Sequence, residues 1–140
     1  TAGGPDALLD GRRGSTAWAT GGWQGYQGQD FVAVLNFDRP TPVARAAAGF
    51  LQDTRSWIVL PPALIVEVST DGTTFRQAGR ITHDTPVDTD GVITRDLSLA
   101  LDGAELRALR FRAVNAGPLP SWHPGAGGES FIFIDELLVE

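Results

Sequence analysis

The tryptophan and tyrosine residues of this chain all lie in or beside stretches rich in glycine, proline and polar residues. These aromatic residues are Trp18, Trp23, Tyr26, Trp57 and Trp122. Within a few residues of them stand side chains that form directional hydrogen bonds, namely Gln24, Gln52, Asp53, Arg55 and His123. Aromatic rings stack on flat apolar faces, and these polar groups bind hydroxyls. Because sugars present flat C–H faces together with hydroxyls, the pattern predicts a carbohydrate-binding site.

Each tryptophan has an alternative role, which is to fill one end of the folded domain. Trp18 lies close to an Asp-Gly turn, and we expect it to pack. Trp57 precedes the apolar run Ile58–Leu60 and suits either role. Trp122 lies among proline and glycine residues with His123 beside it, so we expect it to be exposed.

No spacing of residues indicates an enzyme active site. The histidines His83 and His123 are far apart, and nothing singles out a catalytic pair among the 17 acidic residues. The chain lacks the motifs HExxH, GxSxG, GxGxxG and GxxxxGK(S/T). It also lacks cysteine, which excludes a disulfide scaffold, a thiolate zinc site and a cysteine nucleophile. We therefore expect a protein that is not an enzyme.

Composition indicates one globular domain over residues 1–140. Apolar residues make up 42% and charged residues 20% of the 140 residues. The net charge of −6 disfavours nucleic acid and anionic membranes as partners, since both attract basic surfaces. No apolar run approaches the ~20 residues of a membrane helix, so we expect no membrane insertion. The chain begins at Thr1 rather than Met, which suggests a domain excised from a larger protein, and we expect a monomer.

Short β-prone segments separated by turns must position these residues. The expected strands are 31–37, 43–51, 64–69, 74–81, 92–101, 106–114 and 131–139. The segment 43–51 is rich in alanine, but Pro40, Pro42 and Gly49 favour a strand over a helix there. Asp71-Gly72 predicts a hairpin turn. We expect irregular structure over 11–28 and 116–130, and an all-β sandwich or barrel overall.

Within segment 106–114, one alternating set of residues is more apolar than the other. Leu109 and Phe111 belong to that set, so we expect Arg110 and Arg112 to face solvent.

The segment Asp10–Ser15 has the oxygen ligands of a calcium site. It combines a carboxylate, a glycine turn and a hydroxyl, and Ca²⁺ prefers such ligands together with backbone carbonyls. A further carboxylate is required, and Asp135 or Glu136 on the last expected strand is the natural donor. The alternative is a metal-free loop, because Asp-Gly often marks only a turn.

Five segments, in this order, resemble a discoidin-type domain, also called coagulation factor five/eight type C. They are Ala7–Ser15, Trp23–Phe37, Gly49–Pro61, Val66–Phe75 and Ser121–Glu140. More narrowly, the chain resembles the family 32-like carbohydrate-binding modules at the C-terminus of bacterial β-hexosaminidases and related exo-glycosidases. The resemblance implies a galactose-binding-domain-like antiparallel jelly-roll sandwich of about eight strands. It also implies one structural calcium ion, held by Asp10, Ser15, Glu136 and the carbonyls of Ala7 and Arg12.

The resemblance further implies a non-catalytic module that holds an exported glycosidase against the terminal sugars of glycans. Its binding loops would be 20–28, 52–57 and 118–128, its partner the catalytic domain in cis, and its location extracellular or periplasmic in a bacterium. The family's galactose-binding set of His, Arg and Asn does not align with this chain, so no sugar is implied. A structural domain that packs on the catalytic domain without binding sugar is the main alternative. A membrane-binding or protein-binding discoidin module is a third reading, and the acidic charge disfavours lipid.

Overall fold

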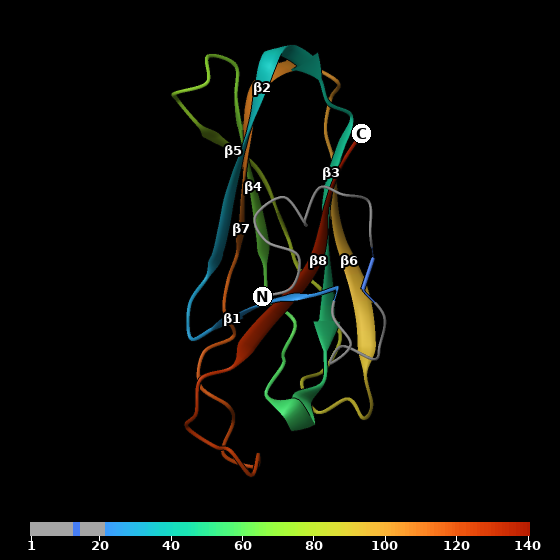
Figure 1. Cartoon of the computed structure of the whole chain (residues 1–140), viewed down its shortest axis with the longest axis vertical. Helices are drawn as coiled ribbons and strands as arrows, with labels where there is room; N and C mark the ends of the chain where they lie inside the picture. Colours follow the sequence, from blue (N-terminus) through green and yellow to red (C-terminus); the bar gives the residue numbers. More distant parts are fainter. Residues whose placement is uncertain (1–12, 15–21) are drawn as a thin grey trace.

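The described residues form two antiparallel sheets, each of four strands. The computed structural model describes residues 13–14 and 22–140. In spatial order, the first sheet contains β1 (Gln24–Gln27), β8 (Phe131–Val139), β3 (Arg45–Gln52) and β6 (Ile93–Ala100). The second sheet contains β2 (Phe31–Pro42), β7 (Glu105–Ala113), β4 (Leu64–Ser69) and β5 (Arg76–Ile81). This order, 1-8-3-6 facing 2-7-4-5, is that of an eight-stranded jelly roll, so the all-β sandwich prediction is confirmed (Figure 1).

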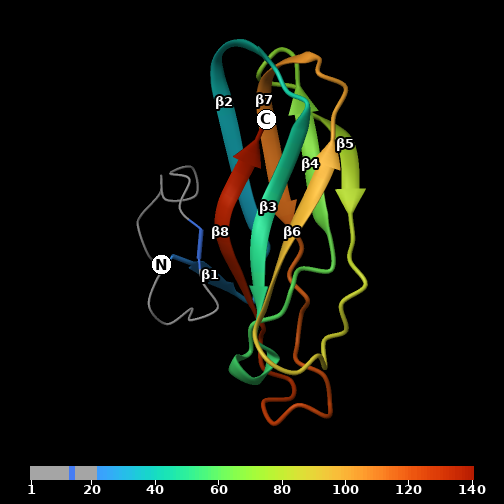
Figure 2. The same ribbon diagram turned by 90° about the vertical axis from the view of Figure 1, so that its right-hand side faces the viewer.

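The hydrophobic core lies between the two sheets, which are separate layers in Figure 1 and lie one in front of the other in Figure 2. Phe50, Ile132 and Ile134 face it from the first sheet. Val66 and Phe111 face it from the second sheet. Alternation along each strand places these residues on the inner face, and burying each large apolar side chain stabilises the fold by roughly 1.5–3 kcal/mol.

The expected strands are present with small shifts at their ends, except that β2 continues beyond the expected residue 37 to Pro42, and the alanine-rich segment is strand β3. Ala46, Ala47 and Ala48 are fully buried, because β3 lies inside its sheet between β6 and β8. The prediction of irregular structure over 11–28 is wrong for Gln24–Gln27, which forms β1 and pairs with β8. A four-residue strand that alternates little has no periodic signal, and its pairing depends on a partner distant in sequence.

The expectation for the two arginines of β7 holds for Arg112, which is exposed. Arg110 is only half-buried, and its guanidinium donates to both carboxylate oxygens of Glu67 on β4, at 3.0 and 2.6 Å. The same guanidinium lies 4.3 Å from the ring centre of Phe75, and this contact links β7 to the connection between β4 and β5. No helix in the described part of the chain is long and apolar enough to cross a membrane.

Candidate functional site

Three connections between strands meet at one end of the sandwich, the lower end in Figures 1 and 2. They are the β3–β4, β5–β6 and β7–β8 connections. Between them lies a cleft with a volume of about 340 Å³, here called the polar cleft. Its lining includes Thr54, Arg55, Asp88, Thr89, Asp90, Trp122 and His123.

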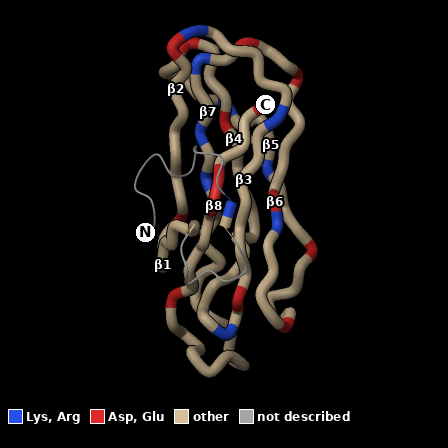
Figure 3. The backbone as a smooth tube through the Cα atoms, turned by 45° about the vertical axis from the view of Figure 1, so that its right-hand side comes forward, with Lys and Arg blue, Asp and Glu red and all other residues tan. Residues whose placement is uncertain are grey.

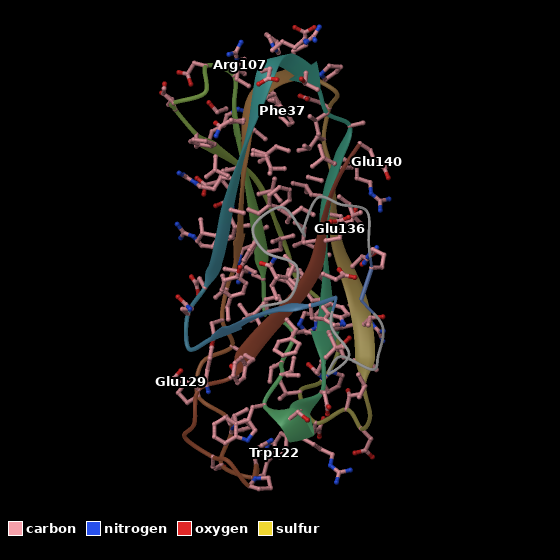
Figure 4. All side chains as sticks on the ribbon, in the orientation of Figure 1. Phe37, Arg107, Trp122, Glu129, Glu136 and Glu140 are labelled. Atoms are coloured by element: carbon pink, nitrogen blue, oxygen red, sulfur yellow. The ribbon has the colours of Figure 1, made fainter. Side chains whose placement is uncertain are left out.

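Trp122 is the most prominent side chain of this end of the molecule. It is 56% exposed, as expected, although most large apolar side chains of the described residues are covered. Figure 4 shows it at the tip of the sandwich, close to the short 3-10 helix η3 (Thr54–Ser56). An exposed indole beside a cleft offers a flat apolar face to a ligand.

His123 attaches the β7–β8 connection to η3 through hydrogen bonds of its ring to backbone groups. Its Nδ1 accepts a hydrogen bond from the Gly125 N–H at 2.8 Å, so the proton of the neutral ring lies on Nε2. Nε2 then donates to the Thr54 carbonyl at 2.6 Å. Both ring nitrogens are therefore occupied by backbone groups, which leaves neither to act as a catalytic base.

Trp57 supports the same connection by packing. Its residue has a positive φ of 70°, which ends η3 and turns the indole toward the β7–β8 connection. A Cβ on Gly125 or on Gly128 would lie 2.5 Å from ring atoms of Trp57, so only glycine allows the indole to approach so closely. Trp57 was predicted to suit either packing or ligand binding. The structure shows packing, because the β7–β8 connection covers its ring.

The β5–β6 connection is attached to the same end by side chains of β3 and η3. The Gln52 amide, fully buried, donates to the Pro86 carbonyl at 3.0 Å and accepts from the Leu60 N–H at 3.2 Å. The Thr54 hydroxyl donates to the Val87 carbonyl at 2.5 Å. Asp53 instead accepts a bond from the Ser56 hydroxyl at 2.9 Å within the turn.

These attachments present Asp88 and Asp90 at the polar cleft, two residues that the sequence analysis missed. The signal available was a connection rich in Asp, Thr and Pro between two strands, at 82–91. Among the described residues, neither these carboxylates nor the Arg55 guanidinium forms a hydrogen bond or ion pair, and all three are exposed. Figure 3 shows both signs of charge at this end. The cleft can therefore donate and accept hydrogen bonds beside an aromatic face.

Of the residues predicted to bind ligand, Arg55, Trp122 and His123 line the polar cleft, and Gln52, Asp53 and Trp57 support it from beneath. The three predicted residues of the β1 region do not line it. Trp23 is 5% exposed and packs with Leu51 and Ile58.

The other two predicted residues of β1 bond to each other. The Tyr26 hydroxyl donates to Gln24 Oε1 at 3.0 Å, and its ring meets Phe31 edge-on at 5.1 Å. Burial raises the pKa of Tyr26 above its ordinary value.

Most of the predicted calcium ligands, Ala7, Asp10, Arg12 and Ser15, lie outside the described residues, as does Trp18. Glu136 is described and is 2% exposed. It follows Asp135 where the pairing of β8 with β3 shifts register, between Ala48 and Phe50. Two residues of β8 therefore oppose Gly49 alone, which is a β-bulge.

Arg13 compensates part of the negative charge at this bulge. Its guanidinium bonds to Asp96 at 2.5 Å and to Asp135 at 2.8 Å, and both bonds raise its pKa above the ordinary value. A Cβ on Gly49 would collide with Asp135 and Arg13, so this arrangement requires glycine there. In the described part of the chain, no group of three or more metal-ligating side chains comes together.

Comparison with known proteins shows a fold relative only. No protein-family model matches the chain, and no curated protein matches it. A solved structure from Bacteroides thetaiotaomicron does match, a fragment (298–461) of a protein provisionally described as a chitobiase. The two superpose with a TM-score of 0.55 and 14% sequence identity, over 98% of this chain and 74% of the other.

Proposed function

We propose that this chain is a non-catalytic carbohydrate-binding module that holds a glycosidase against the terminal sugars of glycans. The observation that carries the proposal is the exposed Trp122 ring beside a cleft with available Arg55, Asp88 and Asp90 side chains. A pyranose ring stacks on indole through its C–H face, while its hydroxyls bond to carboxylates and guanidinium. The site is shallow, so we expect weak binding, with a free energy of about −4 to −6 kcal/mol.

The fold relative supports the link to glycosidases, because it is a fragment of a protein described as a chitobiase. In this proposal the chain is a discoidin-type domain, joined in cis to a catalytic domain that acts outside the cytoplasm, in the periplasm or extracellularly. The polar cleft supplies recognition and the partner domain supplies the chemistry.

A glycan array with the purified chain is the first test of this proposal. Binding to a set of glycans that share one terminal sugar would support it and define the ligand class. If a folded sample binds no glycan on the array, the proposed function is wrong.

Substitution at the cleft then locates the site. Trp122→Ala should weaken binding at least about tenfold, since it removes the stacking surface, and it should leave the melting temperature nearly unchanged because the ring is exposed. Arg55→Ala should also weaken binding, whereas Arg112→Ala, an exposed arginine on the second sheet, should not. Isothermal titration with the best array ligand measures all three. Unchanged affinity of Trp122→Ala would contradict this site.

A second candidate function, a structural domain that packs on a catalytic domain, has one observation in its favour. Val32 and Val34 on β2 are 51% and 44% exposed on the outer face of the second sheet. Apolar side chains exposed together can mark a protein interface. Val32→Ser with Val34→Ser would then weaken association with the catalytic domain, and neither the wild-type chain nor this variant would bind a glycan.

We also propose that a structural calcium ion binds at the β8 bulge. Asp135 Oδ1 is buried and has no hydrogen-bond partner among the described residues, and the adjacent Glu136 is buried as well. Two adjacent buried carboxylates with one guanidinium nearby fit a divalent cation, which prefers such oxygen ligands. Glu136, Asp10, Ser15 and the carbonyls of Ala7 and Arg12 would hold the ion, which would stabilise the fold by linking these segments.

Calorimetric melting with and without calcium tests the metal proposal. Calcium should raise the melting temperature of the wild-type chain, because it binds the folded state selectively. Glu136→Gln should lose most of this response, and Glu105→Gln, at an exposed glutamate of β7, should keep it. A wild-type melting temperature that is equal in calcium and in chelator would favour the metal-free loop.

A further inference from the structure

A second cleft lies at the same end of the sandwich, and Trp122 belongs to its lining too. It also has a volume of about 340 Å³. The remaining lining is largely apolar and includes Val59, Val87, Pro118, Leu119 and Pro120; we call it the apolar cleft. The β5–β6 connection also lines both clefts. Val87 lines the apolar cleft, and the next residue, Asp88, lines the polar cleft.

Several polar groups at and around the apolar cleft already form hydrogen bonds within the protein. The Ser130 hydroxyl donates to the Gly117 carbonyl at 2.8 Å, and the Asn115 amide donates to backbone carbonyls of Gln29 and Ser130. The Leu119 N–H donates to the Gly128 carbonyl at 2.8 Å. A ligand in this cleft therefore gains mainly nonpolar contact, and a methyl group placed there is removed from water.

The two clefts thus differ in chemistry and share one aromatic wall. The polar cleft suits a unit with many hydroxyls, because Arg55, Asp88 and Asp90 are available there. The apolar cleft suits a unit with an apolar substituent, because hydroxyls buried there would lose hydrogen bonds to water without replacement. Because Trp122 lines both clefts, its side chain can contact both units.

We infer that the site binds two consecutive sugar units, with a methyl-bearing unit in the apolar cleft. The methyl group belongs either to an N-acetyl group or to a 6-deoxy carbon, since both present the same apolar surface. This inference rests on the proposed function, because it assigns the sugar class to that same site. It differs from a single-sugar site in requiring that a disaccharide bind more tightly than its terminal unit alone.

Titration of the wild-type chain with matched sugars tests both parts. Di-N-acetylchitobiose is compared with N-acetylglucosamine for the number of units, and with cellobiose for the acetamido groups. For the 6-deoxy source, 2′-fucosyllactose is compared with fucose for the number of units, and with its analogue that carries L-galactose in place of L-fucose for the methyl group. We expect one methyl-bearing oligosaccharide to bind about tenfold more tightly than its methyl-free counterpart and than its single unit. If each methyl-bearing oligosaccharide binds detectably but no more tightly than its methyl-free counterpart, the inference is overturned and the proposed function stands.

Substitutions in each cleft distinguish the role of the apolar cleft from that of the polar cleft. Val87→Asp places a charge in the apolar cleft and should abolish the preference for the methyl-bearing sugar. Val87→Ile keeps the apolar wall and should retain it. Asp88→Asn, in the polar cleft, should weaken the binding of methyl-bearing and methyl-free sugars to the same extent. Val87 is 36% exposed, so these variants should fold, which circular dichroism verifies.

The outcomes distinguish the inference from its premise. A preference that survives Val87→Asp would overturn the assignment of the methyl group to the apolar cleft. Array binding confined to glycans with neither an N-acetyl group nor a 6-deoxy sugar would overturn the inference alone. Binding to no glycan at all would overturn both the inference and the proposed function.

Discussion

Several side chains with strong hydrogen-bonding capacity at the loop end are occupied by the protein's own backbone. His123 joins Thr54 to Gly125, and Gln52 joins Leu60 to Pro86. Both residue types suit a sugar ligand, and the structure uses these two to hold the connections that form the cleft. The ligand-facing groups are instead Trp122, Arg55 and the carboxylates of the β5–β6 connection. Residue type alone therefore does not separate a binding side chain from a positioning one.

Replacement of His123 tests its positioning role. His123→Ala removes one of the two bonds to the Thr54 carbonyl, which keeps the Trp57 N–H, and removes the bond that the Gly125 N–H donates to the ring, which together should lower the free energy of unfolding by about 1–3 kcal/mol. Hydrogen exchange in segment 120–128 should become faster than in wild type. His83→Ala is the matched control, since His83 is only half-buried and accepts one bond, from the Thr85 N–H at 3.1 Å. Equal losses of stability in the two variants would contradict this role for His123.

At the scale of elements, the β4–β5 hairpin shows how one acidic residue defines a turn. Asp71 Oδ1 accepts bonds from the N–H groups of Thr73 and Thr74, at 2.8 and 2.7 Å, and from the Ser69 hydroxyl at 2.9 Å. Gly72 follows with a positive φ of 84°, which glycine adopts without strain. These bonds, led by the one to Thr74, hold the pKa of Asp71 well below its ordinary value of 3.8.

The lowered pKa of Asp71 predicts how hairpin stability depends on pH. The unfolded state takes up the Asp71 proton at higher pH than the folded state does, so stability from the ionised carboxylate is complete above about pH 5 and is lost as the pH falls through and below the ordinary value. The melting temperature of Asp71→Asn should therefore lie furthest below wild type near neutral pH and approach it toward about pH 2. Asp102→Asn is the control, because Asp102 accepts one N–H bond in its turn, from Ala104. A gap that stays constant across this pH range would rule out the assignment.

At the scale of the whole molecule, the jelly roll separates its surfaces by chemistry. One end carries the two clefts, and the outer face of the second sheet carries Val32 and Val34 on its edge strand. An edge strand such as β2 has unpaired backbone groups that can bond to another chain. However, β2 contains Pro40 and Pro42 and has a register irregularity between Asn36 and Thr41. Proline and irregular pairing both disfavour the addition of a further strand.

We expect the isolated chain to be monomeric at neutral pH, because its net charge of −6 opposes self-association. The repulsion should vanish near the isoelectric point of about 4.8, where solubility should be lowest. Sedimentation velocity at neutral pH, with and without added salt, measures the association. A dimer that persists in low salt and is lost in Val32→Ser with Val34→Ser would contradict the monomer and identify the exposed β2 face as an interface.

Elements whose signals are local could be predicted from the residues alone. Alternating apolar residues define β4 and β7, and Asp71-Gly72 defines the hairpin between β4 and β5. The proline and glycine residues around Trp122 indicated a loop and an exposed ring, which the structure confirms. These features depend on neighbouring residues, because strand periodicity and turn geometry are properties of a few consecutive positions.

Which of these elements lie in contact could be learned only from the folded molecule. β1 forms because β8 lies beside it, and Asp88 and Asp90 reach the polar cleft because Gln52 and Thr54 bond to the β5–β6 connection. The two clefts share Trp122 because three connections, far apart in the chain, meet at one end of the jelly roll. Such contacts depend on the order of the strands in the sheets, and no local pattern of residue types records that order.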